Sequence, residues 1–570
     1  MRIKHFFGLA VIAAMTASCS SNNDLVNGGG NGSGEVETGA SYASFSINLP
    51  TTSGTRADDD PTFTKGDDNE YKVNDATLLI FKKGATEAEG DYTFVESAEL
   101  GSMAPWRDPN EAGVTTHAKI TAKLEKVNKA ETNFALVLLN NGTGANAKVN
   151  LPSEGDKFSA WNTAAKATDK FANYENGFYM ANAPLFKDHN VTTLVPIESS
   201  KIYSTEEEAA KNAATDIYVE RGLAKVTLGT GTTTEKTVTS STYQDDKVTI
   251  SNWALDVTNL KTFPIHNVDE LGYEDIWKNE AAPSGPSTKR FVDNKESTKA
   301  KRVYWGKDPN YDKDDLRKTD AAGKTAREAD FKYVKNADVT ADPAKPLYCL
   351  ENTFNLANMV QGQTTRIVFK ATYTPKGITT GDTFYKIGKN TAIWSKDNLE
   401  TEIKTAVASV FPGTTTDKIT VNLDAEENKI TAAGTHYIKK DNITVTGVET
   451  ITDENIKAIN TQLGLKETDK VGISTYAGGE SYYVARIKHF GDELTPWSSG
   501  GYGSDNLSFL GRYGMLRNNW YELTVSSVSG PGYPSVPEVK PNTPDDEDDK
   551  YISVSVKILD WAKRSQSVDL

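Results

Sequence analysis

Short segments in which polar and apolar residues alternate recur along most of this chain. In Ala43-Ser44-Phe45-Ser46-Ile47-Asn48-Leu49 every second side chain is apolar, so the apolar ones share one face of an extended strand. Such a face is stable only when a second layer covers it. The alternation therefore predicts a mostly β chain built of β-sandwiches.

Other segments of the same kind are separated by Gly, Asn, Asp and Pro, which favour turns between strands. We expect further strands at Ala76 to Phe81, Phe134 to Leu139, Ala224 to Leu228, Val248 to Leu255, Thr365 to Tyr373, Tyr482 to Ile487 and Trp520 to Val525.

A few segments instead have helical spacing behind an N-cap signal, so we expect short helices in the connections between strands. The signals are Ser204 with Glu207 ahead of Ala209-Ala210, Asp397 ahead of Leu399, Ile403, Ala406, Val407 and Val410, and Thr452 ahead of Ile456, Ile459 and Leu463.

The length, charge and cysteine content limit the possible classes of protein. With 570 residues the chain exceeds the roughly 250 to 300 residues that one core usually reaches, which indicates at least two domains. The net charge of -15 argues against a nucleic-acid or anionic-lipid partner, since both attract basic surfaces. Cys349 is the only cysteine besides Cys19, so we expect no internal disulfide and a buried Cys349.

The first residues have the pattern of an exported lipoprotein. Arg2 and Lys4 precede an apolar run from 6 to 15, and Thr16-Ala17-Ser18-Cys19 follows. The run is shorter than the roughly 20 apolar residues that span a bilayer, so it is a targeting segment. We expect residues 1–18 to be a signal peptide and Cys19 to be the lipidated N-terminus of the precursor.

Arg56 is the first basic residue after Cys19. It lies in a polar loop directly after the strand formed by Ala43, Phe45, Ile47 and Leu49, so a trypsin-like protease cutting between Arg56 and Ala57 would release that strand with the lipid. The alternative is that Arg56 is an ordinary surface arginine.

The C-terminal part combines a spacer and a strand. Residues 531–550 are rich in Pro and Asp, and this composition favours an extended, solvated segment that joins no core. Alternation returns in 551–570, and a lone strand needs a sheet to pair with. It either folds back on its own domain or is donated to a neighbouring molecule by β-augmentation. Its apolar residues are Ile552, Val554, Val556, Ile558, Leu559 and Trp561.

These features together resemble the fimbrilins of type V pili from Bacteroidales, most closely the major (shaft) subunits of short fimbriae. The residues that carry the resemblance are the lipobox at Cys19, Thr55-Arg56-Ala57, Val219-Glu220-Arg221-Gly222-Leu223-Ala224-Lys225-Val226, Arg517-Asn518-Asn519-Trp520-Tyr521, and the block from Ile552 to Leu570. The segment from Pro375 to Ile473 shows no specific motif.

The resemblance implies a fold of two transthyretin-like β-sandwich domains and a life cycle as a shaft subunit. The precursor would be lipidated, carried to the outer membrane and cut after Arg56 by an arginine-specific protease. The mature chain would then polymerise by donor-strand exchange with itself and with accessory anchor or tip subunits, forming a cell-surface fimbrium that supports adhesion and biofilm formation. The implied parts are a propeptide at 19–56, an N-terminal domain at 57–217, a C-terminal domain at 218–530, the spacer and the donor strand.

No pattern of a catalytic or cofactor site appears, so we expect neither enzyme activity nor a cofactor. The six histidines lack metal-ligand spacing, and no HExxH, nucleophile-elbow or P-loop motif occurs. The segment Asp308 to Asp314 resembles the start of a calcium loop, but Lys313 stands where glycine is needed.

A second hypothesis is a monomeric surface lipoprotein that binds glycans. It rests on aromatic residues near Gly500 that are expected to be exposed, namely Trp497, Tyr502 and Tyr513, since aromatic faces stack on sugars.

Overall fold

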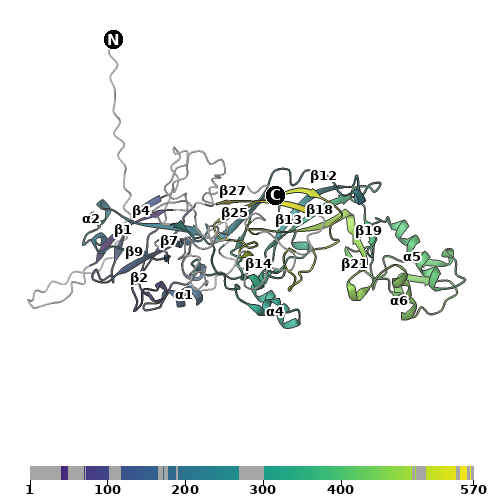
Figure 1. Ribbon diagram of the computed structural model, residues 1–570, viewed down its shortest axis with the longest axis horizontal. Helices are drawn as coiled ribbons and strands as arrows, with labels where there is room; N and C mark the ends of the chain where they lie inside the picture. The colour runs from purple at the N-terminus through teal and green to yellow at the C-terminus, as the bar shows by residue number, and fades with distance from the viewer. Residues whose placement is uncertain are drawn as a thin grey trace, which may run out of the picture. The chain divides into compact units, whose positions relative to one another are not determined.

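Strands dominate the computed structural model, and the helices are few and short (Figure 1), which confirms the mostly β fold class. The structure describes residues 40–48, 70, 72–101, 117–164, 171, 177–187, 190–268, 301–303, 305–490, 495, 509–546, 552–560 and 565–566.

The N-terminal half forms one large sheet that folds over its own core. Its strand order is β3-β2-β5-β6-β10-β1-β4, and β9 pairs with β5. Apolar residues of β1 and β10 pack against those of β2 and β5 in one cluster. The strands are β1 (Ser41–Asn48), β2 (Ala76–Lys82), β3 (Thr93–Glu99), β4 (His117–Leu124), β5 (Asn133–Leu139), β6 (Met180–Asn182), β9 (Val195–Ile197) and β10 (Thr215–Arg221).

Two further sheets pack face to face around a second core. One has the order β17-β11-β25-β26-β27 and the other β12-β13-β18-β24, and residues of both sheets share one apolar cluster. The strands are β11 (Leu223–Leu228), β12 (Lys236–Thr237), β13 (Lys247–Asp256), β17 (Leu347–Leu350), β18 (Arg366–Thr374), β24 (Glu480–Arg486), β25 (Asn519–Val528), β26 (Ile552–Asp560) and β27 (Ser565–Gln566).

The segment between β18 and β24, for which the sequence showed no motif, has an apolar core of its own. Two helices lie with several short strands there (Figure 1). These elements are β19 (Phe384–Ile387), α5 (Lys396–Val410), β20 (Ile419–Val421), β21 (Gly434–His436), β22 (Ile443–Val445), α6 (Asp453–Gln462) and β23 (Ile473–Tyr476).

The remaining helices and short strands lie in connections. They are α1 (Phe158–Ala164), α2 (Glu206–Lys211), α4 (Ala321–Asp330), β7 (Leu185–Lys187), β8 (Asn190–Thr192), β14 (Thr258–Asn259), β15 (Lys301–Arg302) and β16 (Phe331–Lys332).

Each predicted strand overlaps an observed one, and the predicted helices exist, but two of their starts were wrong. The side chain of Thr205, not Ser204, caps α2, and Ser395 caps α5, so that Asp397 lies in its first turn. Thr452 caps α6 as predicted, with Asn455 completing the capping box. The chain passes from the first sheet to the second at Gly222, between β10 and β11, and the domain boundary near residue 217 stays a prediction.

The prediction that the spacer joins no core was wrong for its part up to residue 546. Tyr533 forms a β-bridge with Tyr482, and Asp545 is 0% exposed beside Arg486. Both Asp546 oxygens accept hydrogen bonds from Arg512, at 2.6 and 2.7 Å. The carboxylates are thus neutralised by arginines distant in sequence, which makes their burial possible.

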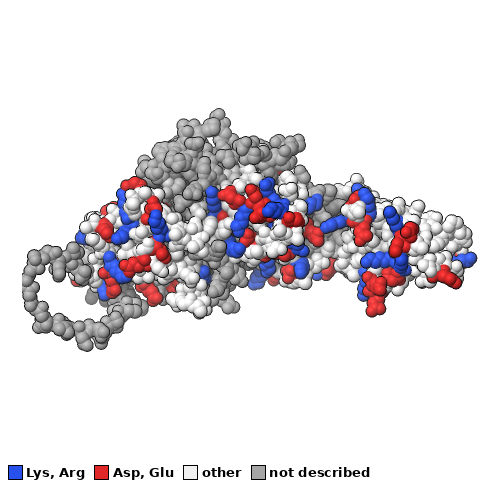
Figure 2. Space-filling model, turned by 90° about the horizontal axis from the view of Figure 1, so that it is seen from below, with Lys and Arg blue, Asp and Glu red and all other residues white. Residues whose placement is uncertain are grey.

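Charges of both signs are interspersed over the face of the molecule drawn in Figure 2. This face shows no continuous basic patch of the kind that attracts nucleic acid.

Candidate functional site

The predicted removable strand, β1, lies between two other strands of the first sheet. It pairs in parallel with β10, where Phe45 lies opposite Thr215, and antiparallel with β4, where Ser44 lies opposite Thr121. We call the place between β4 and β10 the β1 site. Ala43, Phe45 and Ile47 are each 0% exposed, so the alternation in the sequence directs every one of these apolar side chains into the core.

The opposite face of β1 is covered by α2. Ser44 is 1% exposed; its hydroxyl donates to the carbonyl of Ala209 at 2.7 Å and lies 2.8 Å from the hydroxyl of Thr121. On β4, Lys119 donates to the carbonyls of Ala210 and Asn212 at the end of α2, at 2.8 and 2.7 Å. These contacts tie both β1 and β4 to the helix.

The predicted donor strand, β26, pairs with its own domain in the isolated chain. It runs antiparallel to β25, with Val556 opposite Leu523 and Val554 opposite Val525. Of the two alternatives for the terminal strand, folding back is therefore the arrangement of a single molecule. The pairing covers the donor residues Ile552, Val554, Val556, Ile558 and Leu559.

Several predicted site residues lie outside the described residues. They are Cys19 as the lipidation site, Leu49 of the removable strand, Arg56 and Ala57 at the cleavage site, and Trp561 of the donor strand.

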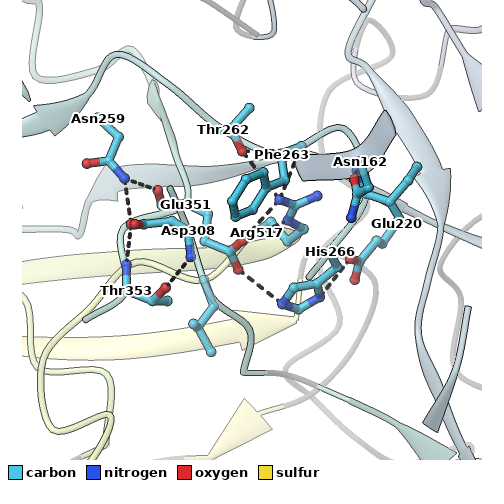
Figure 3. Close-up of polar contacts among 12 residues, drawn as sticks. Asn162, Glu220, Asn259, Thr262, Phe263, His266, Asp308, Glu351, Thr353 and Arg517 are labelled. Carbon is cyan, nitrogen blue, oxygen red and sulfur yellow. Dashed lines mark hydrogen bonds and ion pairs between the residues drawn. The ribbon is translucent and has the colours of Figure 1, made fainter. Parts of the chain in front are cut away.

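A buried polar network lies where the first sheet meets the second (Figure 3). His266 Nδ1 is 2.9 Å from Glu220 on β10, and Nε2 is 3.2 Å from Glu351, which follows β17. Arg517, just before β25, lies 3.0 Å from Glu351. All four side chains are at most 2% exposed, so these charges depend on one another for stability.

The buried charges of this network shift the pKa values of His266 and Glu351. Burial disfavours the imidazolium form, but Glu351 and Glu220 outweigh it and raise the pKa of His266 to about 9. Burial likewise disfavours the ionised form of Glu351, yet Arg517 and His266 hold its pKa at about 2. His266 is thus a cation between two carboxylates at neutral pH.

Asp308 begins the segment whose sequence resembles the start of a calcium loop, and it lies in the same region as the network (Figure 3). Its carboxylate accepts hydrogen bonds from the side chain of Asn259 at 2.6 Å and from the backbone of Thr353 and Asn310 at 2.7 and 2.6 Å. Burial raises its pKa to about 7. Protein donors already occupy both oxygens, so Asp308 has a structural role.

A second buried ion pair lies on β11 beside the same junction. Lys225 is 2.6 Å from Glu70, and the two side chains are 3% and 0% exposed. Arg221 donates to the backbone carbonyl of Glu70 at 3.0 and 2.9 Å, and Tyr348 donates to its carboxylate at 2.6 Å. The sequence analysis used Arg221 and Lys225 only for the family resemblance and did not predict this ion pair; the available signal was the presence of charged residues within the apolar run from Val219 to Val226.

The other expectations about chemistry concern single residues. Cys349 is buried, as predicted, and burial raises the pKa of its thiol to about 12. Within the described ranges, no group of three or more His, Cys, Asp or Glu could hold a metal ion, and no helix there is long and apolar enough to cross a membrane.

The glycan-binding hypothesis expected Tyr513 to be exposed, and this prediction was wrong. This residue is 1% exposed, and its hydroxyl donates to Asp546 at 3.0 Å. Trp497 and Tyr502 lie outside the described residues.

The comparison with protein families points to fimbriae. Residues 474–567 match the family described as major fimbrial subunit protein type IV, fimbrillin, C-terminal, which confirms the expected resemblance to fimbrilins. The chain is also similar to the crystal structure of a fimbrial assembly protein from Parabacteroides distasonis ATCC 8503. The two share 10% identity at a TM-score of 0.27, over 62% of this chain and 93% of that one. No curated protein matches the chain.

Proposed function

We propose that this chain is a structural, non-enzymatic subunit of a cell-surface fimbrium and that it forms the shaft, because residues 474–567 match the C-terminal region of the fimbrillin family. In this proposal the subunit loses β1 by proteolysis and polymerises by inserting its terminal strand, 551–570, into the β1 site of a neighbour.

The single observation that carries the proposal is the position of β1. Loss of this strand would expose the core that Ala43, Phe45 and Ile47 fill, each at 0% exposure, together with the unpaired backbone edges of β4 and β10. Such an opening favours capture of another apolar strand. A subunit that has lost β1 therefore has a strong preference for a donor.

In this proposal the subunit loses β1 during its maturation from a lipoprotein precursor. Cys19 carries the lipid that delivers the precursor to the outer membrane, and an arginine-specific protease cuts between Arg56 and Ala57. The lipid and β1 leave together. Accessory anchor and tip subunits use the same exchange to join the polymer.

The energetics favour exchange only after cleavage. In the precursor both strands are paired within one chain, since β1 lies between β4 and β10 and β26 lies beside β25. Burial of each large apolar side chain contributes roughly 1.5 to 3 kcal/mol, so an empty β1 site offsets the cost of detaching β26 from β25. Cleavage is thus the trigger for assembly.

Trypsin treatment of the purified precursor tests the proposal. We expect the mature chain to begin at Ala57 by N-terminal sequencing and to form ladders that resist SDS. Arg56→Gln should block both results, and deletion of 551–570 should allow cleavage but abolish the ladder. Ladder formation by the deletion variant, or polymers that retain Cys19, would contradict the proposal.

A further inference from the structure

The terminal strand repeats the side-chain pattern of the strand that it is proposed to replace. Residues 43–47 read Ala-Ser-Phe-Ser-Ile, and residues 552–556 read Ile-Ser-Val-Ser-Val. A tyrosine precedes each run, Tyr42 in the first and Tyr551 in the second. Two segments at opposite ends of the chain thus share both serines and the apolar positions between them.

We propose that Ile552–Val556 of one copy occupies the β1 site of the next in the register of Ala43–Ile47, with Ser553 in the place of Ser44. This inference rests on the proposed function and specifies its partner surface: a second copy of this chain, aligned residue by residue. Ile552, Val554 and Val556 then fill the core, and Ser553 binds under α2.

Ser44 shows why a serine is needed at this position. Its side chain is 1% exposed and is hydrogen-bonded both to the carbonyl of Ala209 and to the hydroxyl of Thr121. When β1 leaves, this carbonyl and this hydroxyl lose that partner, and an incoming strand would cover both groups again. A donor with serine at the same position restores both contacts, which matters because a buried polar group without a partner is unfavourable.

A shift by one residue is excluded by the alternation. Side chains of a strand point alternately to its two faces, so a one-residue slip exchanges all of them between core and outer face. Ser553 and Ser555 would then enter the core where Phe45 and Ile47 are 0% exposed. The apolar pattern therefore restricts the donor to shifts of even length.

A shift by two residues keeps the apolar pattern but changes the outer face. Ser555 would then occupy the place of Ser44, and Lys557 would occupy that of Ser46. Ser46 lies directly opposite Lys119 on β4, with Asp216 on its other side. Lys557 would be attracted by Asp216, but this gain is offset because like charges directly opposite each other destabilise a sheet and Lys119 is held there by its bonds to α2. The unshifted register avoids this contact and preserves both serines.

Disulfide trapping between copies tests the register. The full chain carrying Thr121→Cys together with Ser553→Cys is cut with trypsin, allowed to polymerise and oxidised with diamide. The polymers are then boiled in SDS without reductant. Thr121→Cys together with Ser555→Cys is the matched control. Background is low because cleavage removes Cys19 and Cys349 is buried.

The pair Ser44→Cys and Thr121→Cys in the uncut precursor is the positive control, because these two residues lie opposite each other within one chain. It should form an internal disulfide. We expect a reducible ladder from the double variant with Ser553→Cys and monomers from the double variant with Ser555→Cys. A ladder from the variant with Ser555→Cys alone would overturn the register, as would the absence of cross-links from both variants in polymers that assemble.

If the double variant with Ser553→Cys does not assemble, the single variants Ser553→Ala and Ser555→Ala provide a second test of the register. We expect polymers of Ser553→Ala to dissociate at a lower guanidinium concentration than those of Ser555→Ala, and equal midpoints would overturn the register. A wrong register can be distinguished from a wrong proposed function. If the proposed function were wrong, the wild-type chain itself would form no polymer after cleavage.

Discussion

His266 Nδ1 lies 2.9 Å from the carboxylate of Glu220, and both side chains are almost completely buried. Glu220 lies near the end of the strand beside β1 in the first sheet, whereas the other nitrogen of His266 contacts Glu351, which follows a strand of the second sheet. The imidazolium thus links the two sheets by charge. In the proposed function the subunit bears tension along the fibre, and this junction lies between the core of the first sheet and the core of the second.

Replacement of His266 should weaken the junction strongly. His266→Gln removes the cation and leaves two carboxylates buried at close range, which we expect to lower the free energy of unfolding by about 3 to 5 kcal/mol. Urea unfolding of the precursor near neutral pH measures the change. His436→Gln is the control, since His436 is partly exposed and lies in β21. A loss below about 1 kcal/mol, typical of exposed ion pairs, would contradict the assignment.

Stability should also fall at alkaline pH because of the same residue. The pKa of His266 is about 9 in the folded chain against an ordinary value of 6.5, so the folded state binds the proton more tightly. The resulting stabilisation is complete below the ordinary pKa and is lost as the pH rises through about 9. We expect the urea midpoint of the wild type to fall across this interval. The decline should be smaller in His266→Gln, and equal slopes would contradict the prediction.

The segment that leads to the terminal strand should depend on Asp546. Asp546→Asn replaces one of the two oxygens that accept from Arg512, whose guanidinium is 1% exposed, and leaves a buried cation without its carboxylate. We expect faster amide exchange and proteolysis across 531–546. Glu538→Gln is the matched control in the same segment, because its partner Lys470 is exposed. Equal exchange in the two variants would show that the carboxylate does not anchor this segment.

The β elements were predictable because their signal is local. Each strand such as β13 or β25 carries its own alternation, and the burial of Ala43, Phe45 and Ile47 follows from it directly. The packed spacer was not predictable, because the partners of Asp545 and Asp546 are arginines distant in sequence.

The polar network around His266 could not be predicted from the sequence either, because its members are distant from one another along the chain. The partners of His266 are Glu220 and Glu351, and only the fold brings them together. The capping residues of α2 and α5 were missed by one or two positions because several polar residues precede each helix and the sequence alone does not rank them. α4 was not predicted at all, since alanine is the only apolar side chain in its sequence, AAGKTAREAD, and its buried residues are Gly323, Arg327 and Asp330.

The substitution Phe45→Ala separates the precursor from the mature subunit. Phe45 is 0% exposed in the core, so the large-to-small change should destabilise the precursor by about 3 to 5 kcal/mol. Ser46→Ala, at a partly exposed position of the same strand, should cost less than about 0.5 kcal/mol. If maturation removes everything before Ala57, both variants yield the wild-type mature chain. Their polymers should then match the wild type in guanidinium resistance, although the Phe45→Ala precursor melts earlier. Polymers of Phe45→Ala that dissociate more readily than those of the wild type would mean that β1 stays in the fibre.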